Sequence, residues 1–220
     1  MQKTDAVSPS EAVLVFAITI VLFLFLGAAF VLLLGIEFAL VFSELIFLVV
    51  PLGYLLLKRV DIKSYIGAEI RPKFILFGIA SGIFLLFFDG AISAVLTSIF
   101  GVSQAVEESN ALIANLGSSA LGLVLVAIAL SLAGFCEEFA FRAFLQNTIS
   151  RKYSFVPALI VSSVAFGLVH FDPQLVYIIS AFLMGLVLGF IYNRWHSYLA
   201  SAVAHSTVNL VALAILLLAG

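Results

Sequence analysis

Seven long apolar segments dominate this 220-residue sequence and constrain what it can fold into. A helix that spans a bilayer needs about 20 mostly apolar residues. The strands of a membrane β-barrel alternate polar and apolar residues, whereas these segments are apolar on all sides. The sequence therefore predicts an all-α polytopic membrane protein with about seven transmembrane helices. The expected spans are residues 11–34, 37–57, 73–100, 118–149, 155–171, 174–193 and 197–219.

The composition excludes several other classes of protein. Hydrophobic residues make up 64% of the chain and charged residues 10%, with a mean hydropathy of +1.28. A soluble domain carries roughly a quarter charged residues, so neither a soluble globule nor a disordered chain fits. The net charge of −2 gives no basic patch for phosphates, and we expect no nucleic-acid partner. The single cysteine, Cys136, cannot form an intrachain disulfide.

The basic residues predict the orientation of the spans. If the N-terminus is cytoplasmic, nine of the ten Lys and Arg residues fall on the cytoplasmic side, as the positive-inside rule requires. These nine are Lys3, Lys58, Arg59, Lys63, Arg71, Lys73, Arg151, Lys152 and Arg194. The opposite connections contain Glu107, Glu108 and Asp172 but no basic residue. The tenth, Arg142, lies within the fourth span, and the C-terminus is expected outside.

We expect one membrane-embedded domain with two parts. Residues 1–117 contain the first three spans and an outer surface loop at 101–117, and residues 118–220 form a core of four spans. The Gly78-x-x-x-Gly82 and Gly185-x-x-x-Gly189 patterns predict close helix packing within the chain. A dimer face is the alternative explanation, and the sequence does not predict an oligomeric state.

Ionisable residues within the spans indicate a functional site, because each costs about 3 kcal/mol at the centre of a bilayer. Glu138 and Arg142 are four residues apart, which predicts an ion pair on one helix face. Glu137 lies about 100° around the helix and is free of that pair, so it is a candidate general base. The alternative is that these charges only pack helices together. Glu44 and Asp89 are interpreted as polar contacts facing each other between spans two and three, with substrate contact as a lesser alternative.

Two further pairs have the same four-residue spacing on later spans. Phe166 shares a helix face with His170, and His205 shares one with Asn209. Counted from the basic end, the polar groups lie at similar depths of about 16–22 Å. Taken alone, His170 is better explained by hydrogen bonding between helices, and the His205–Asn209 pair is explained equally well by a polar seam between helices. Their common depth favours a single site within the helical bundle.

A carboxylate and two histidines permit hydrolysis without a covalent intermediate. A Glu, alone or with a His, would take a proton from water, while a second His and an Asn would stabilise the oxyanion. A zinc-dependent alternative places Zn²⁺ among Glu137, His170 and His205, although no H-E-x-x-H motif supports it. Cys136 as a nucleophile is a third alternative, and a small apolar packing role competes with it.

Together these residues form three motifs on successive late spans. The motifs are Glu137-Glu138-x-x-x-Arg142, Phe166-x-x-x-His170 and His205-x-x-x-Asn209. Over about residues 118–212 the chain thereby resembles the CAAX-protease and bacteriocin-processing (CPBP) family, in particular type II CAAX prenyl endopeptidases. The resemblance implies that Glu137 and His170 activate water and that His205 and Asn209 form the oxyanion hole. Glu138 and Arg142 complete the first motif, and Phe166 supports His170.

The resemblance also implies a function and a location. We expect an intramembrane endopeptidase in a prokaryotic cell membrane, with its active site toward the cytoplasmic side. The expected partners are membrane lipids and a membrane-anchored or prenylated peptide substrate. No cofactor is expected, with Zn²⁺ as the alternative for a family often labelled as metalloproteases. A non-catalytic immunity or scaffold protein of the same fold and a proton-coupled transporter are the competing hypotheses; the lack of paired broken helices disfavours the transporter.

Overall fold

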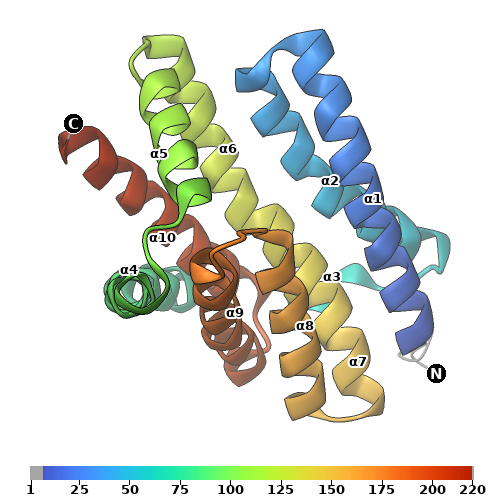
Figure 1. Ribbon diagram of the computed structural model, residues 1–220. Coiled ribbons are helices and arrows are strands. Elements are labelled where there is room, and N and C mark those ends of the chain that lie inside the picture. The colour runs from blue at the N-terminus through green and yellow to red at the C-terminus, as the bar shows by residue number, and fades with distance from the viewer. Residues whose placement is uncertain (1–6, 220) are drawn as a thin grey trace.

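The computed structural model describes residues 7–219, and no β-strand occurs within that range. Lys3, which the sequence assigns to the cytoplasmic side, lies outside the described residues. Figure 1 shows the helices in chain order. They are α1 (Pro9–Leu34), α2 (Ile36–Leu57), α3 (Ile62–Ile66), α4 (Pro72–Phe100), α5 (Gln104–Gly117), α6 (Ala120–Glu138), the π-helix η1 (Phe139–Gln146), α7 (Asn147–Lys152), α8 (Phe155–Val169), α9 (Val176–Trp195) and α10 (Tyr198–Ala219).

The expected multi-pass membrane architecture is confirmed. Six helical stretches are long and apolar enough to cross a bilayer, and α8 is a shorter apolar helix of 15 residues. The expected fourth span is one continuous helical rod over Ala120–Lys152, formed by α6, η1 and α7. The protein is therefore an integral membrane protein of about seven membrane helices.

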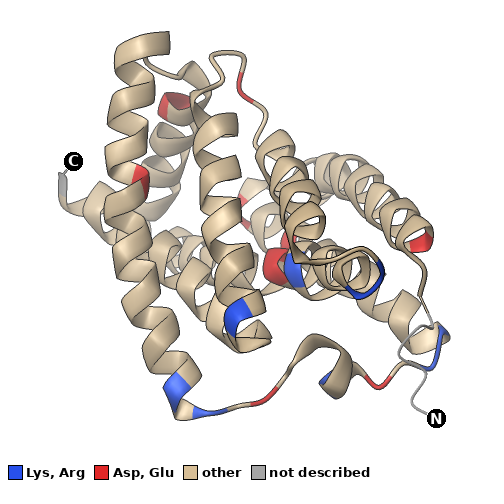
Figure 2. Cartoon of the chain, turned by 90° about the horizontal axis from the view of Figure 1, so that it is seen from below, with Lys and Arg blue, Asp and Glu red and all other residues tan. Residues whose placement is uncertain are grey.

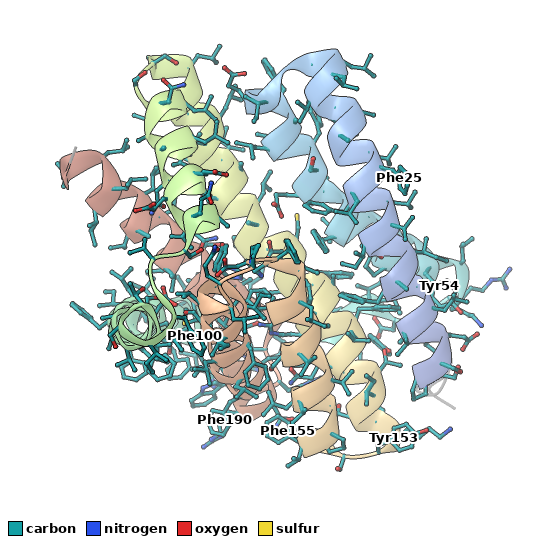
Figure 3. All side chains as sticks on the ribbon, in the orientation of Figure 1. Phe25, Tyr54, Phe100, Tyr153, Phe155 and Phe190 are labelled. Atoms are coloured by element: carbon teal, nitrogen blue, oxygen red, sulfur yellow. The ribbon has the colours of Figure 1, made fainter. Side chains whose placement is uncertain are left out.

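The rod that contains η1 lies at the centre of the bundle. The α1–α2 hairpin packs against one side of it, and α10, paired with α4, packs against another. The α8–α9 pair covers η1. All eight residues of η1 are buried, whereas many helix residues elsewhere face outward. Phe25 and Phe190, for example, are 73% and 54% exposed and project from the bundle in Figure 3, as lipid-facing side chains do.

The expectation of a surface loop at 101–117 is wrong, because most of this segment is helix α5. Gly101, with a φ of 87°, ends α4, and Ser103 starts α5 by accepting a hydrogen bond from the Val106 N–H. Leu116 on α5 is buried in a small apolar cluster with residues of α6 and α10. Gly, Ser and Asn residues in the segment indicated a loop. Its one-sided apolar pattern is instead that of a helix lying on the bundle.

The Gly78-x-x-x-Gly82 and Gly185-x-x-x-Gly189 patterns pack helices within the chain, as expected. Gly78 and Gly82 bring α4 against the α10 backbone near Ala200 and Ala204. The second pair brings α9 against α8 and η1, near Ser163, Leu159 and Gln146. The α4–α10 contact matters for the site, because α10 carries two of its candidate residues.

Gly82→Ala is expected to destabilise the protein, whereas Gly90→Ala on the same helix is not. A Cβ at residue 82 would lie 2.5 Å from the Thr207 Cβ, while nothing lies within 4 Å of one at residue 90. Overpacking of this kind costs about 1–3 kcal/mol. Thermal unfolding in detergent should show a lower melting temperature for Gly82→Ala only. Equal melting temperatures for the two variants would mean that α4 does not pack closely on α10.

The charged residues separate along the molecule. In Figure 2 the blue Lys and Arg segments all lie in the lower half of the view, and the charged segments in its upper half are red. Within the described range, the basic residues other than Arg142 lie in the short helix α3 or at the ends of α2, α4, α7 and α9 that the expected orientation makes cytoplasmic. Helix α5, with Glu107 and Glu108, lies at the opposite end of α4. Most described basic residues thus gather at one end of the bundle, and the assignment of that end to the cytoplasm stays a prediction from the positive-inside rule.

Candidate active site

The predicted ion pair between Glu138 and Arg142 is confirmed. The two side chains are 0% exposed, and the Arg142 Nε lies 3.4 Å from the Glu138 Oε2. Within residues 7–219, the guanidinium nitrogens of Arg142 make no hydrogen bond. The guanidinium instead lies over aromatic rings, 4.4 Å from the Phe166 centroid and 5.6 Å from that of Phe141. The contact between Arg142 and Phe166 therefore joins η1 to α8.

Glu138 also contacts one of the two candidate histidines. Its second oxygen, Oε1, lies 3.3 Å from the Nδ1 of His205 on α10. A carboxylate accepts hydrogen bonds, so Nδ1–H donates and Nε2 becomes the ring nitrogen available for other partners. Glu138 thus bridges Arg142 and His205, a connection that the four-residue spacing within one helix did not predict.

The other candidate histidine, His170, has its ring orientation fixed locally. Its Nδ1 lies 2.7 Å from the backbone oxygen of Phe166. Since a carbonyl oxygen only accepts, Nδ1 carries the proton, and Nε2 of the neutral ring has a free lone pair. The ring also packs against the rings of Phe166 and Tyr177, with centroid distances of 4.8 Å to each. His170 can therefore accept a proton at Nε2.

One cavity of about 380 Å³ brings together several of the predicted residues. His170 and Phe166 line it from the end of α8, and His205 and Asn209 line it from α10. One N–H of the Asn209 side-chain amide donates to the Leu130 carbonyl oxygen at 3.1 Å, which holds the amide on the cavity wall. The expected grouping of the His170 and His205 motifs in one place is thus seen in the structure.

Glu137 is not among the residues that line this cavity. Its side chain is half-buried, and its Oε2 is buried without a hydrogen-bond partner in the described part of the chain. The groups that interact with it electrostatically are Glu44, His205, Glu138 and Arg142. No hydrogen bond joins Glu137 to His170 within residues 7–219, so their joint action on a water molecule stays a prediction.

Residues that the sequence did not assign to the site also lie close to it. Tyr177 lines the cavity and contacts the His170 ring. The Asp172 carboxylate accepts the Tyr177 backbone N–H at 2.8 Å and so fixes the start of α9. In the sequence, Tyr177 is indistinguishable from the tyrosines that commonly flank membrane helices.

We expected Glu44 and Asp89 to face each other, but each has a different partner. Asp89 accepts a hydrogen bond from Ser180 of α9 and lines the cavity, whereas Glu44 on α2 interacts electrostatically with Glu137. Cys136 is buried and free, and it does not line the cavity. This placement favours the packing role for Cys136 over the nucleophile.

The residues proposed for a zinc ion do not form a ligand set. Across the described residues, no group of three or more His, Cys, Asp or Glu side chains is arranged to hold a metal. Glu137, the third residue of the proposed set, lies outside the lining of the cavity that His170 and His205 share. We therefore derive no chemical step through a metal ion.

The fold and the site define a polytopic membrane protein whose acidic and histidine residues meet inside the helical bundle. Residues 118–211 match the family model described as "Type II CAAX prenyl endopeptidase Rce1-like". The resemblance expected from the three motifs is thereby confirmed for the part of the chain that carries them.

Two curated relatives agree with this assignment. The chain is 27% identical over 135 residues, 61% of its length and 53% of the relative's, to "Putative membrane peptidase YdiL" of Bacillus subtilis (strain 168). It is 31% identical over 74 residues to "UPF0177 protein YxdF" of Lactococcus lactis subsp. lactis (strain IL1403), which covers 34% of this chain and 40% of that protein. The chain thus spans about half the length of these relatives or less. No solved structure matches it.

Proposed function

We propose that this protein is an intramembrane endopeptidase that hydrolyses a peptide bond of a membrane-anchored substrate. The observation that carries the proposal is the single cavity into which His170, His205 and Asn209 converge, in a segment that matches a prenyl endopeptidase family. A cavity of about 380 Å³ falls within the range of small-ligand sites and accommodates a short peptide segment.

In the proposed mechanism, a water molecule attacks the scissile carbonyl carbon. Glu137 takes a proton from the water as the new C–O bond forms. The Nε2 of His170 accepts a hydrogen bond from the same water molecule and helps to orient it. The negative oxygen of the tetrahedral intermediate is stabilised by N–H donors: the free N–H of the Asn209 amide, and the Nε2–H of a His205 ring that carries protons on both nitrogens while its Nδ1–H is held by Glu138. The C–N bond then breaks, and the departing amine receives the proton that the base had taken. Glu138, fixed by Arg142, positions the His205 ring throughout.

The walls of the cavity favour an apolar or lipid-modified substrate. Met184, Leu188 and Val208 contribute apolar surface next to the polar groups. A substrate anchored in the bilayer, with or without a prenyl group, presents a peptide at this depth. We further propose that the protein belongs to a prokaryotic cell membrane, and the bacterial sources of both relatives support this proposal.

The cavity extends toward the end of the bundle that carries α5. Val106 and Asn110 of α5 line the cavity, and α5 lies at the end of α4 remote from Arg71 and Lys73. In the predicted orientation this is the outer side of the membrane. The family resemblance implies an active site toward the cytoplasmic side, and the side from which a substrate enters stays a prediction.

Cleavage by the purified full chain tests the proposed function. In proteoliposomes it should cleave at least one of a panel of prenylated and unmodified membrane-anchored peptides, and 1,10-phenanthroline should change the rate by less than about twofold, because no ligand set is formed. The measurement is product formation by mass spectrometry. Loss of activity with chelator and recovery with Zn²⁺ would establish the zinc-dependent alternative. No cleavage of any peptide would favour the immunity or scaffold protein.

A further inference from the structure

A carboxylate that the proposed mechanism does not use lines the same cavity. Asp89, in the second half of α4, is half-buried, and its Oδ1 accepts a hydrogen bond from Ser180. Its Oδ2 makes no hydrogen bond among the described residues and is not a fully buried atom. Asp89 therefore has an oxygen that a ligand in the cavity can reach.

Asp89 begins a polar stripe on a membrane-spanning helix. Ser93 and Thr97 follow it at intervals of four residues, so the three side chains share one face of α4, and all three line the cavity. Asn110 of α5 lines the cavity as well. The stripe offers hydrogen-bonding groups along one wall of the cavity, where a bound polar chain can use them.

No Lys or Arg lines the cavity to pair with Asp89, and the two lining histidines, His170 and His205, have their Nδ1 atoms directed at Phe166 and Glu138. The buried Arg142 is directed at Glu138 as well. The nearby end of the molecule carries Glu107 and Glu108 on α5, which attract cations. An ionised carboxylate in a membrane-embedded cavity is stabilised by a positive partner, and a ligand that enters the cavity can supply one.

We propose that Asp89 is a specificity-determining residue that binds a cationic group of the peptide substrate, namely a Lys or Arg side chain near the scissile bond. This inference rests on the proposed endopeptidase function, because it assigns part of the same cavity to the substrate. The histidine and asparagine residues act on the scissile bond. The stripe headed by Asp89 binds the flanking residues of the peptide and selects those with a positive charge.

Peptide binding separates this inference from catalysis. The full chain carrying Glu137→Gln would be titrated with fluorescent membrane-anchored peptides in which one Lys is moved through the positions around the scissile bond. Norleucine at the same position is the matched control, because it keeps the length and removes the charge. At one or more positions the Lys peptide should bind at least about tenfold more tightly, the effect of a desolvated charge pair.

Asp89→Asn should reduce that preference to within about twofold, since Asn keeps the volume and the acceptor for Ser180 but not the charge. Glu108→Gln removes a charge from exposed α5 without altering the cavity lining, so it should leave the preference intact. As a second variant, Asp89→Lys should reverse the preference toward a Glu-containing peptide.

Equal binding of Lys and norleucine peptides at every position, or an unchanged preference in Asp89→Asn, would overturn the inference. Cleavage by the chain with Glu137 intact reports on the proposed function separately. A preference that depends on Asp89, without cleavage, would overturn the endopeptidase and support the cationic subsite. Cleavage without such a preference would overturn the subsite alone.

Discussion

Glu137→Gln is expected to lower kcat/KM for peptide cleavage by about 10²–10⁴-fold, the usual contribution of a general base. Glutamine keeps the shape of the side chain but cannot accept a proton from water. Glu137 makes no ion pair in the described part of the chain, and its Oε2 has no hydrogen-bond partner there. The substitution should therefore leave the protein folded. The measurements are kcat/KM on the best peptide of the panel and the melting temperature in detergent.

Glu44→Gln is the matched control for that experiment. Glu44 also has a buried oxygen without a hydrogen bond and lies near Glu137, but it belongs to α2 and is outside the matched segment. Its loss should reduce kcat/KM by less than about tenfold, because it removes a neighbouring charge and not the base itself. Full activity of Glu137→Gln would exclude Glu137 as the base. Equal losses in both variants would indicate that the two carboxylates act as a unit.

Arg142→Met is expected to cost about 3–5 kcal/mol of stability, the usual effect of removing one partner from a buried ion pair. Arg142 is 0% exposed, and its removal leaves the Glu138 carboxylate buried beside His205 alone. Methionine keeps much of the apolar volume against Phe166. The free energy of unfolding, measured by denaturant titration in mixed micelles, should fall accordingly.

The double variant Glu138→Gln/Arg142→Met should recover most of that loss. It removes both charges, so no uncompensated ion stays buried. Recovery of stability without recovery of cleavage would show that Glu138 positions His205, because glutamine cannot replace the charge next to the imidazole. An Arg142→Met variant as stable as the wild type would mean that Glu138 finds another partner or is neutral in the folded protein.

The sequence predicted the features that depend on local periodicity. Apolar runs located the membrane helices, and the spacing of Glu138 and Arg142 predicted their ion pair, because both are set within one helix. The contact of Glu138 with His205 could not be predicted from local spacing, since it joins residues 67 positions apart. The cavity positions of Tyr177 and Asp89 likewise depend on how α4, α8 and α9 pack. Helix α5 was missed because its Gly, Ser and Asn content outweighed its short apolar stripe.

The π-helical segment η1 gives the central rod two independent faces. Successive residues of an α-helix advance by about 100°, and a segment with wider turns advances by less. Helix α6, which carries Glu137 and Glu138, is therefore out of angular phase with α7, which carries Arg151 and Lys152. The side of the rod that faces the site cannot be extrapolated along its 33 residues as one ideal helix. The side chains of the active-site end and those of the basic end can thus take different angular positions about the axis of the rod, each suited to its own neighbours.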